Sequence, residues 1–157
     1  MSGDGRTLLY SSYLGGSNRE QMSGVALDDF GNAYFAGDNQ SNDFPVFKPL
    51  QARPASNFDA FLTRISPEGK ILFSTYFGGS GLDGFWAVKW RADGVVILTG
   101  QTTSKDFPLK DPIQTTASPR TGFYNIFLTM IADDGSAVRY STYFGGTSST
   151  AGTALTT

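Results

Sequence analysis

A short motif that occurs three times is the feature that most constrains how this chain of 157 residues can fold. Each copy has an aromatic residue, two small hydroxyl residues, a tyrosine, an apolar residue and a pair of glycines. The copies are Tyr10–Gly16, Phe73–Gly79 and Tyr140–Gly146. Their spacing is nearly constant, which predicts an array or a propeller built from one recurring structural unit.

The sequence around the motif repeats as well. Three further pairs of segments align: Phe30–Gly37 with Asp93–Gly100, Ser41–Pro45 with Ser104–Pro108, and Asp59–Ile65 with Asn125–Ile131. The chain therefore divides into two full units, 17–79 and 80–146, with partial units at 1–16 and 147–157. A propeller ring typically takes four to eight units, so two units are expected to leave the ring open.

Each unit is expected to form four antiparallel strands, with the motif as the fourth. The first three are Ser23–Leu27, Ala33–Gly37 and Phe58–Ile65 in the first unit, and Trp86–Trp90, Val95–Gly100 and Tyr124–Ile131 in the second. In the motif strand, Phe73 and Phe77 point to one face and Tyr76 to the other. A strand without a polar face has to be covered on both sides, as in sheets that stack radially. The first copy, Tyr10–Gly16, is expected to be a fourth strand too.

The composition favours an all-β fold and excludes several kinds of chemistry. The 19 glycines, 7 prolines and 14% aromatic residues suit short strands joined by tight turns. Without cysteine there are no disulfides, and without histidine there is no Ser-His-Asp triad and no ordinary zinc site. The net charge of −2, without a run of either sign, predicts no surface for nucleic acid.

The sequence also lacks the motifs of targeting segments and cofactor sites. The segment Met1–Arg6 has no apolar core of a signal peptide, and no apolar run is long enough to span a bilayer. The segment Gly79–Gly84 matches the G-x-G-x-x-G pattern of dinucleotide sites, but such a site needs a helix next. The residues that follow, Phe85–Trp90, have the pattern of a strand. No cofactor is therefore expected.

Taken in order, the motifs resemble the SBBP repeat, a bacterial β-propeller repeat. The resemblance rests on Tyr-Ser-Thr-Tyr-Phe-Gly-Gly, then Gly31–Gly37, then Ser-x-Asp-Phe-Pro, then Asp59–Gly69, and it covers almost the whole chain. It implies four-stranded blades and an extracellular or cell-surface setting in a large bacterial protein. It brings no catalytic residues with it. The second unit departs from the pattern, since Arg91 stands where the first has Asp28.

Three residues are candidates for ligand binding. Asp43 and Asp106 recur in the Asp-Phe-Pro segments of the two units, and they could form a ring of carboxylates on one face of a propeller. The competing interpretation is local, because aspartates commonly hold loop amides. Trp86 is expected to share one side of its strand with Val88 and Trp90, near a variable end of the unit. Its flat amphipathic ring could serve as a platform for a sugar.

The turn after the first strand is a weak candidate for a metal site. Asp28, Asp29 and Asn32 could supply oxygen ligands to calcium, which takes six to eight of them. The second unit puts the guanidinium of Arg91 where such a site needs a carboxylate. Hydrogen bonding within an Asx turn explains the first copy without a metal, so no metal is expected.

A non-catalytic binding or structural scaffold for a protein or a glycan is the leading hypothesis for function. A carboxylate-based hydrolase or lyase acting on polysaccharide is the alternative, and it needs two acids in a cleft, one of them with a raised pKa. A purely architectural spacer is the third. The expected partners are further repeats of the same protein, or other copies that pair through open strand edges.

Overall fold

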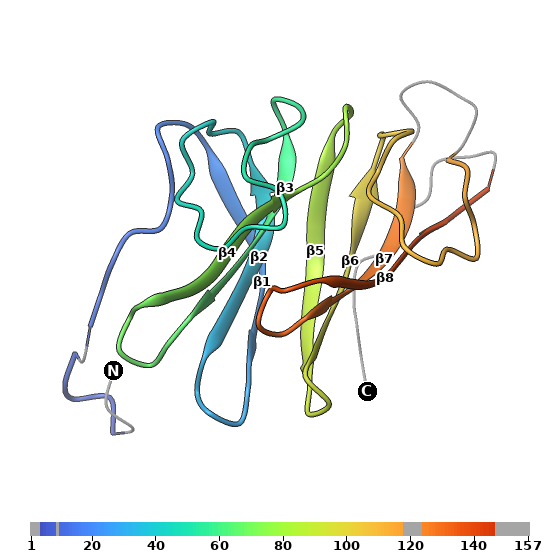
Figure 1. The fold of residues 1–157 in the computed structure, drawn as a ribbon. Helices are drawn as coiled ribbons and strands as arrows, with labels where there is room; N and C mark the ends of the chain where they lie inside the picture. Colours follow the sequence, from blue (N-terminus) through green and yellow to red (C-terminus); the bar gives the residue numbers. More distant parts are fainter. Residues whose placement is uncertain (1–3, 9, 118–123, 147–157) are drawn as a thin grey trace.

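The computed structural model describes residues 4–8, 10–117 and 124–146, and the regular elements among them are all β-strands (Figure 1). The first sheet contains β1 (Glu20–Leu27), β2 (Ala33–Asn39), β3 (Asp59–Ile65) and β4 (Ile71–Phe77). The second contains β5 (Asp83–Arg91), β6 (Val95–Thr102), β7 (Asn125–Ala132) and β8 (Val138–Phe144). Each is antiparallel and ordered as in the chain, which confirms the predicted four-stranded units. None of the described residues forms a helix suited to crossing a membrane.

The polar residues of the motif hold the long connection that joins the second and third strands of each sheet. In β4, the Tyr76 hydroxyl accepts from the Phe44 amide at 3.0 Å and donates to the Ser41 carbonyl at 2.8 Å. The same two bonds recur in the second sheet, where the Tyr143 hydroxyl binds the amide of Phe107 and the carbonyl of Ser104. The connection therefore covers one side of the motif strand, as its doubly apolar pattern predicts.

The two sheets pack face to face. The trailing face of the first sheet consists of Tyr34, Ala36, Leu62, Phe73 and Phe77, and the leading face of the second consists of Phe85, Leu98, Phe127 and Tyr143 together with Phe107 from the connection. All of these residues are buried, and together they form the main core. The Phe77 ring lies 5.8 Å from that of Phe85 and 5.4 Å from that of Phe107, between ring centroids.

The outer strands β4 and β8 have part of their free edges paired within the chain. Phe47 exchanges two backbone hydrogen bonds with Ser74, and Lys110 does the same with Ser141. At these positions the connection blocks the edge, which is a common way to prevent pairing with another chain. Association with another chain through open strand edges is therefore blocked at these paired positions of β4 and β8. Exposed apolar side chains remain on the faces of the sheets, among them Met22 and Phe144.

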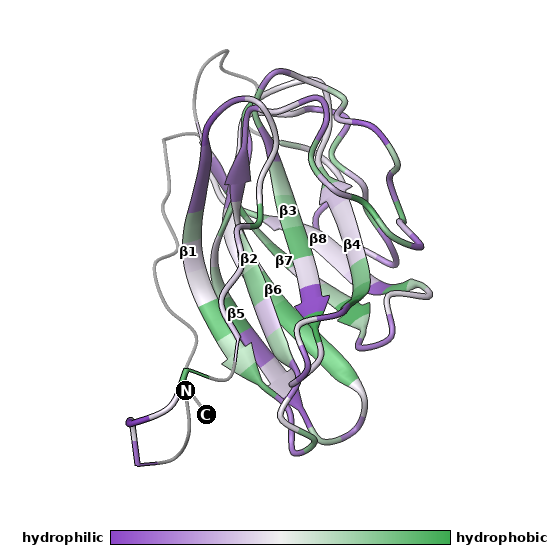
Figure 2. Cartoon of the chain, turned by 90° about the vertical axis from the view of Figure 1, so that its left-hand side faces the viewer, coloured by the Kyte–Doolittle hydropathy of each residue, from purple (hydrophilic) through white to green (hydrophobic). Residues whose placement is uncertain are grey.

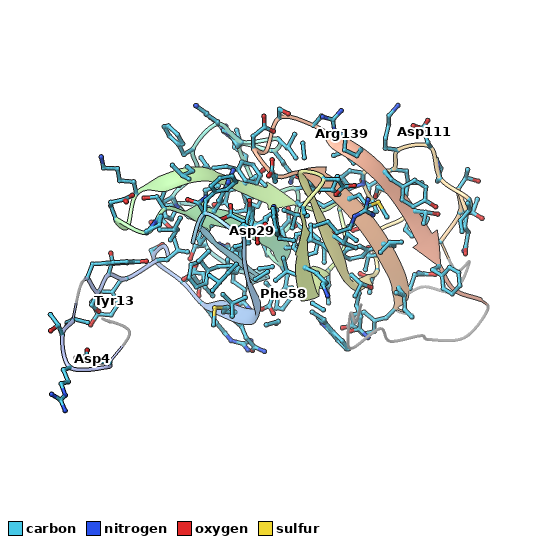
Figure 3. The ribbon with its side chains drawn as sticks, turned by 90° about the horizontal axis from the view of Figure 1, so that it is seen from below. Asp4, Tyr13, Asp29, Phe58, Asp111 and Arg139 are labelled. Carbon is cyan, nitrogen blue, oxygen red and sulfur yellow. The ribbon has the colours of Figure 1, made fainter. Side chains whose placement is uncertain are left out.

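The first copy of the motif is not a strand, contrary to the prediction. Residues 10–16 have no strand assignment, and Tyr13 points away from the body of the molecule and is fully exposed (Figure 3), although Tyr10 and Leu14 contact the first sheet. A fourth strand pairs with the third strand of its own sheet, and the described residues before Tyr10 contain none. The motif pattern alone therefore does not make residues 10–16 a strand, because a strand also needs a neighbouring strand to pair with.

Candidate functional site

A β-bulge places Trp86 differently from the prediction. In β5, Phe85 pairs with Gly100 and Ala87 with Thr99, so Trp86 is an extra residue between two rungs of the ladder. The bulge interrupts the simple alternation, and Phe85 packs in the core together with Val88 and Trp90. The prediction that Trp86 shares their side was therefore wrong. Bulges often re-aim a side chain next to a binding site.

Trp86 lines a pocket of about 270 Å³ that we call the Trp86 pocket. The pocket lies where the first sheet meets the second, at the starts of β1 and β5 and the ends of β2 and β6. Its lining residues are Arg19, Gln21, Asp38, Phe58, Leu82, Asp83, Gly84, Trp86, Gln101 and Tyr124. Aromatic rings, amides, a guanidinium and two carboxylates thus line one small space, and these convergent polar groups make it a candidate ligand site.

Asp83 is the more buried of the two carboxylates, with 1% of its surface exposed. Its Oδ2 accepts from the Gly79 amide at 2.8 Å and from the Ser104 hydroxyl at 2.7 Å. Its Oδ1 has no hydrogen-bond partner among the described residues. Burial raises the pKa of Asp83 to about 6, although the nearby hydroxyls of Thr102 and Ser104 and the Gly79 amide act against this.

Asp38, near the end of β2, carries the second incomplete carboxylate. Its Oδ2 is buried without a hydrogen-bond partner in the part of the chain that the structure describes. Burial raises the pKa of Asp38, and the positive charge of Arg19 acts in the opposite direction. A buried acceptor left without a donor costs about 1–3 kcal/mol. Because this oxygen is shielded from solvent, a ligand donates to it only after the side chains around the pocket move.

Neither carboxylate of the Trp86 pocket was identified from the sequence. The counterpart of Asp38 in the second unit is Gln101, so comparison of the two units did not single out Asp38. Asp83 corresponds to Glu20, whose carboxylate accepts from the Ser41 hydroxyl as Asp83 does from Ser104. The useful signal was the replacement of Ser23 by Trp86 at the bulge position, because a large aromatic side chain there differs from its counterpart.

Asp43 and Asp106 hold the glycine-rich segments that follow the motif. The Asp43 carboxylate accepts from the amide and the hydroxyl of Ser17, at 2.8 and 3.0 Å. Asp106 binds Ser80 in the same way, at 2.8 and 2.9 Å. Hydrogen bonds from the Ser17 and Ser80 amides hold the pKa values of both carboxyls below their ordinary range. The geometry favours the local interpretation of these residues, and neither lines the Trp86 pocket.

Replacing Asp106 with alanine is expected to lower thermal stability without changing ligand binding. The substitution removes two hydrogen bonds at an exposed position, so the loss in free energy of unfolding should be below about 2 kcal/mol. A thermal melt followed by circular dichroism measures it, with Lys105→Ala, at the adjacent exposed position, as the control. An unchanged melting temperature together with lost binding would contradict the local role.

The turn proposed as a metal site is closed by a guanidinium instead. Arg64 donates to Oδ2 of Asp28 at 2.7 Å, and Asn32 donates to both oxygens of the same carboxylate at 2.8 Å. Asp29 is exposed. The described residues contain no cluster of three or more histidine, cysteine, aspartate or glutamate side chains suited to a metal. Because Asp28 is already saturated with donors, it is a structural residue.

The glycine-rich segment Gly79–Gly84 leads directly into β5, so the helix that a dinucleotide site needs is missing from it. Its glycines belong to the tight connection between β4 of the first sheet and β5 of the second. Ser80 and Gly81 in this segment donate amide hydrogen bonds to Asp106 and Ser104. The G-x-G-x-x-G match is therefore a consequence of a tight connection.

Two four-stranded antiparallel sheets, joined in chain order and packed face to face, have the architecture of neighbouring blades of a β-propeller. Residues 9–45 match the family model of SBBP, a beta-propeller repeat. The match runs from the first copy of the motif to the Asp-Phe-Pro segment, and it confirms the resemblance over this range. No curated protein matches the chain. A propeller repeat indicates a structural or binding role.

Proposed function

We propose that this protein is a non-catalytic scaffold that binds a glycan in the Trp86 pocket. The observation that carries the proposal is the placement of two incomplete carboxylates, Asp38 and Asp83, beside an indole ring that a bulge has re-aimed. The extracellular or cell-surface setting that the SBBP resemblance implies in a bacterium belongs to the same proposal.

A sugar suits the chemistry of the pocket. Its hydroxyl groups donate hydrogen bonds, and the carboxylates of Asp38 and Asp83 that line the pocket are acceptors. The guanidinium of Arg19 and the amide of Gln101 offer donors in return. The face of Trp86 gives the apolar side of a sugar ring a flat surface to pack on.

A polysaccharide hydrolase is the second candidate, because both pocket carboxylates have raised pKa values. Such an enzyme needs two acids that flank the scissile bond and face the substrate. Asp83 is almost completely buried, and one of its oxygens already holds the connection between the sheets. This favours binding over hydrolysis. The presence of a polar pocket likewise counts against a purely architectural spacer.

Trp86→Ser is the variant that tests the proposal, because serine is the residue at the corresponding bulge of β1. Isothermal titration calorimetry of the unmodified chain with glucose, galactose, N-acetylglucosamine and their oligomers is expected to identify at least one ligand. Loss of the ring should weaken that binding by about tenfold or more, which corresponds to about 1.4 kcal/mol.

Asp38→Asn serves as the second variant, since it keeps the size of the side chain and removes the acceptor that lacks a donor. It is expected to weaken binding while the melting temperature stays the same or rises. Equal affinities of all three proteins for the sugar would contradict the pocket assignment. Binding to peptides and to none of the sugars would mean that the ligand is a protein and not a glycan.

A further inference from the structure

Two sheet faces of the described residues are repeat counterparts of the two faces packed together in the core, and each carries an exposed apolar side chain, Met22 on one and Phe144 on the other. The leading face of the first sheet consists of Met22, Phe35, Phe61 and Tyr76 with Phe44 from the connection, matching the leading face of the second sheet. The trailing face of the second sheet consists of Ile97, Thr99, Leu128, Tyr140 and Phe144, matching the trailing face of the first. The interface between the two sheets therefore serves as a template.

The leading face of the first sheet has the same arrangement of rings as its packed counterpart. Phe44 lies 4.9 Å from Phe61 and 5.9 Å from Tyr76, between centroids. The counterpart ring Phe107 lies 4.3 Å from Phe127 and 6.1 Å from Tyr143. The face is thus already formed in the way that the template interface needs.

Part of each face is less covered than its counterpart in the core, although Phe44, Phe61 and Tyr76 are buried, as are their counterparts. Met22 is 56% exposed, whereas its counterpart Phe85 is fully buried. Phe144 is 61% exposed, whereas its counterpart Phe77 is buried. Figure 2, which looks onto the first sheet, shows the carboxyl-terminal half of β1 as hydrophobic, and Leu27 at its end is exposed. Apolar surface of this kind marks interaction sites.

One polar contact of the template interface is not repeated between the two open faces. Within the core interface, Arg64 of the first sheet donates to the Asp133 carbonyl of the second at 3.1 Å. The counterpart of Arg64 on the open trailing face is Met130, and the counterpart of Asp133 beside the open leading face is Pro67. A charged side chain is thus replaced by an apolar one on the trailing face, whereas the main-chain carbonyl that accepts from Arg64 in the template is present at Pro67 as well. Contact between the open faces leaves no guanidinium unpaired at this position.

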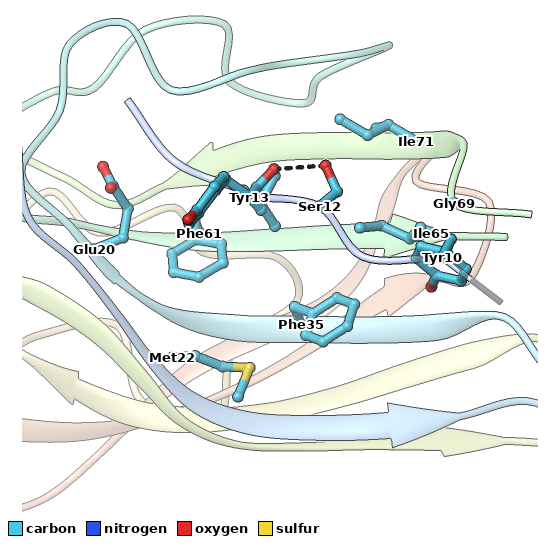
Figure 4. A pocket seen from close by; sticks show the side chains of 11 residues that line it. Tyr10, Ser12, Tyr13, Glu20, Met22, Phe35, Phe61, Ile65, Gly69 and Ile71 are labelled. Carbon is cyan, nitrogen blue, oxygen red and sulfur yellow. Dashed lines mark hydrogen bonds between the residues drawn. The ribbon is translucent and has the colours of Figure 1, made fainter. Parts of the chain in front are cut away.

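The segment of residues 10–14 lies on the leading face of the first sheet. Tyr10 packs on Gly69, as Phe73 packs on the counterpart Gly135 in the template interface. Leu14 packs on the aromatic cluster of the leading face, which is the place that Phe77 takes in the template. The segment occupies the position of a neighbour's fourth strand. It leaves a pocket of about 350 Å³ over Met22, Phe35 and other residues of the sheet (Figure 4).

We propose that a second copy of this chain binds here, with the trailing face of its second sheet on the leading face of the first sheet. Tyr140 and Phe144 of the second copy replace Tyr10 and Leu14, and its β8 lies where residues 10–14 lie in this structure. The contact joins two different surfaces, so each copy keeps one open face after binding. Such head-to-tail contacts generate a ring or an extended filament.

Two single variants test this contact. Met22→Asp changes the leading face and Phe144→Asp the trailing face, each at an exposed position, so both proteins are expected to fold. In sedimentation velocity the unmodified chain is expected to associate with increasing concentration. Each variant alone is expected to be monomeric over the same range, because a carboxylate in an apolar interface weakens it by about tenfold or more. Phe30→Asp, in the β1–β2 turn and outside both faces, is the control that should associate normally.

The decisive measurement is an equimolar mixture of the two face variants. A head-to-tail contact predicts a dimer and nothing larger, since the mixture retains one intact leading face and one intact trailing face. Pairing through strand edges predicts no difference between the variants and the unmodified chain. Tyr10→Ser, which uncovers Gly69, is expected to strengthen association of the unmodified faces. A monomeric unmodified chain, or a mixture that stays monomeric, would overturn the proposal.

Discussion

Replacing Gly100 with alanine is expected to lower the free energy of unfolding by about 3 kcal/mol, at the upper end of the usual range for overpacked sites. Gly100 lies in β6 opposite the bulge that positions Trp86. A Cβ atom at this residue would lie 1.9 Å from the Gly84 carbonyl oxygen and 2.9 Å from the Phe127 ring. The first obstacle is backbone of the neighbouring strand and the second is a buried core ring, so neither can move cheaply.

Chemical denaturation followed by tryptophan fluorescence measures this effect, and Gly84→Ala is the matched control. Gly84 belongs to the same pair of strands, but its added Cβ would have Asp38 as nearest neighbour at 3.4 Å, an ordinary contact distance. The control is expected to change stability by less than about 1 kcal/mol. Equal losses in the two variants would show that the bulge does not require glycine at position 100.

The bulge and its opposing glycine form a repeated feature of the two sheets. In β2, a Cβ at Gly37 would lie 1.9 Å from the Gln21 carbonyl oxygen, opposite the bulge at Ser23. The backbone arrangement is thus shared by both sheets, and the side chain at the bulge is what differs. Ser23 places a small side chain at its bulge, whereas Trp86 places a large aromatic ring that lines a pocket. Function can therefore vary from unit to unit while the fold stays the same.

The periodicity of the sequence was sufficient to predict the strands and their order, because side-chain alternation and turn glycines are local properties. Gly31 and Gly94, with φ values of 78° and 81°, close corresponding turns in the two sheets. The bulges could not be predicted from the sequence, because an extra residue in a ladder is defined only relative to the partner strand. The side of the strand on which Trp86 lies was mispredicted for that reason.

The candidate site was predicted only in part. Trp86 was identified as a departure from the repeat, but the carboxylates of Asp38 and Asp83 meet it only through contact between sheets. Conversely, Asp43 and Asp106 recur because each holds its own loop. Recurrence within a repeat thus indicated a structural role here. The non-recurring Asp38 and Trp86 line the pocket together with Asp83, whose counterpart in the first unit is also an acid, Glu20.

Replacing Asp28 with alanine is expected to destabilise the fold by about 3–5 kcal/mol, the usual cost of leaving one partner of a buried ion pair alone. The Asp28 side chain is 0% exposed and its partner Arg64 14%. Arg64 also donates to the Asp133 carbonyl of the second sheet, so the pair links the two sheets. The substitution leaves the guanidinium without its counterion and the amides of Phe30 and Asn32 without their acceptor.

The corresponding turn of the second sheet provides the control. Arg91 and Asp93 form an ion pair there, but both side chains are about half exposed. Exposed pairs contribute at most about 1 kcal/mol, so Asp93→Ala should have a small effect on denaturation. Similar losses in Asp28→Ala and Asp93→Ala would contradict the assigned role of burial.

The pH dependence of stability adds a test that is specific to the Asp28 carboxylate. Burial raises its pKa, but hydrogen bonds from the Asn32 side chain and amide, Arg64 and the Phe30 amide outweigh this and hold the pKa below the ordinary 3.8. A lowered pKa in the folded state means that the stabilisation is complete above the unfolded pKa and is lost as the pH falls through the folded one. The difference in unfolding free energy between the unmodified chain and Asp28→Ala should therefore be constant near neutral pH. It should shrink once the pH falls below about 4, the pKa of an unperturbed aspartate. A difference that does not change with pH would mean that the carboxylate charge is not what stabilises this turn.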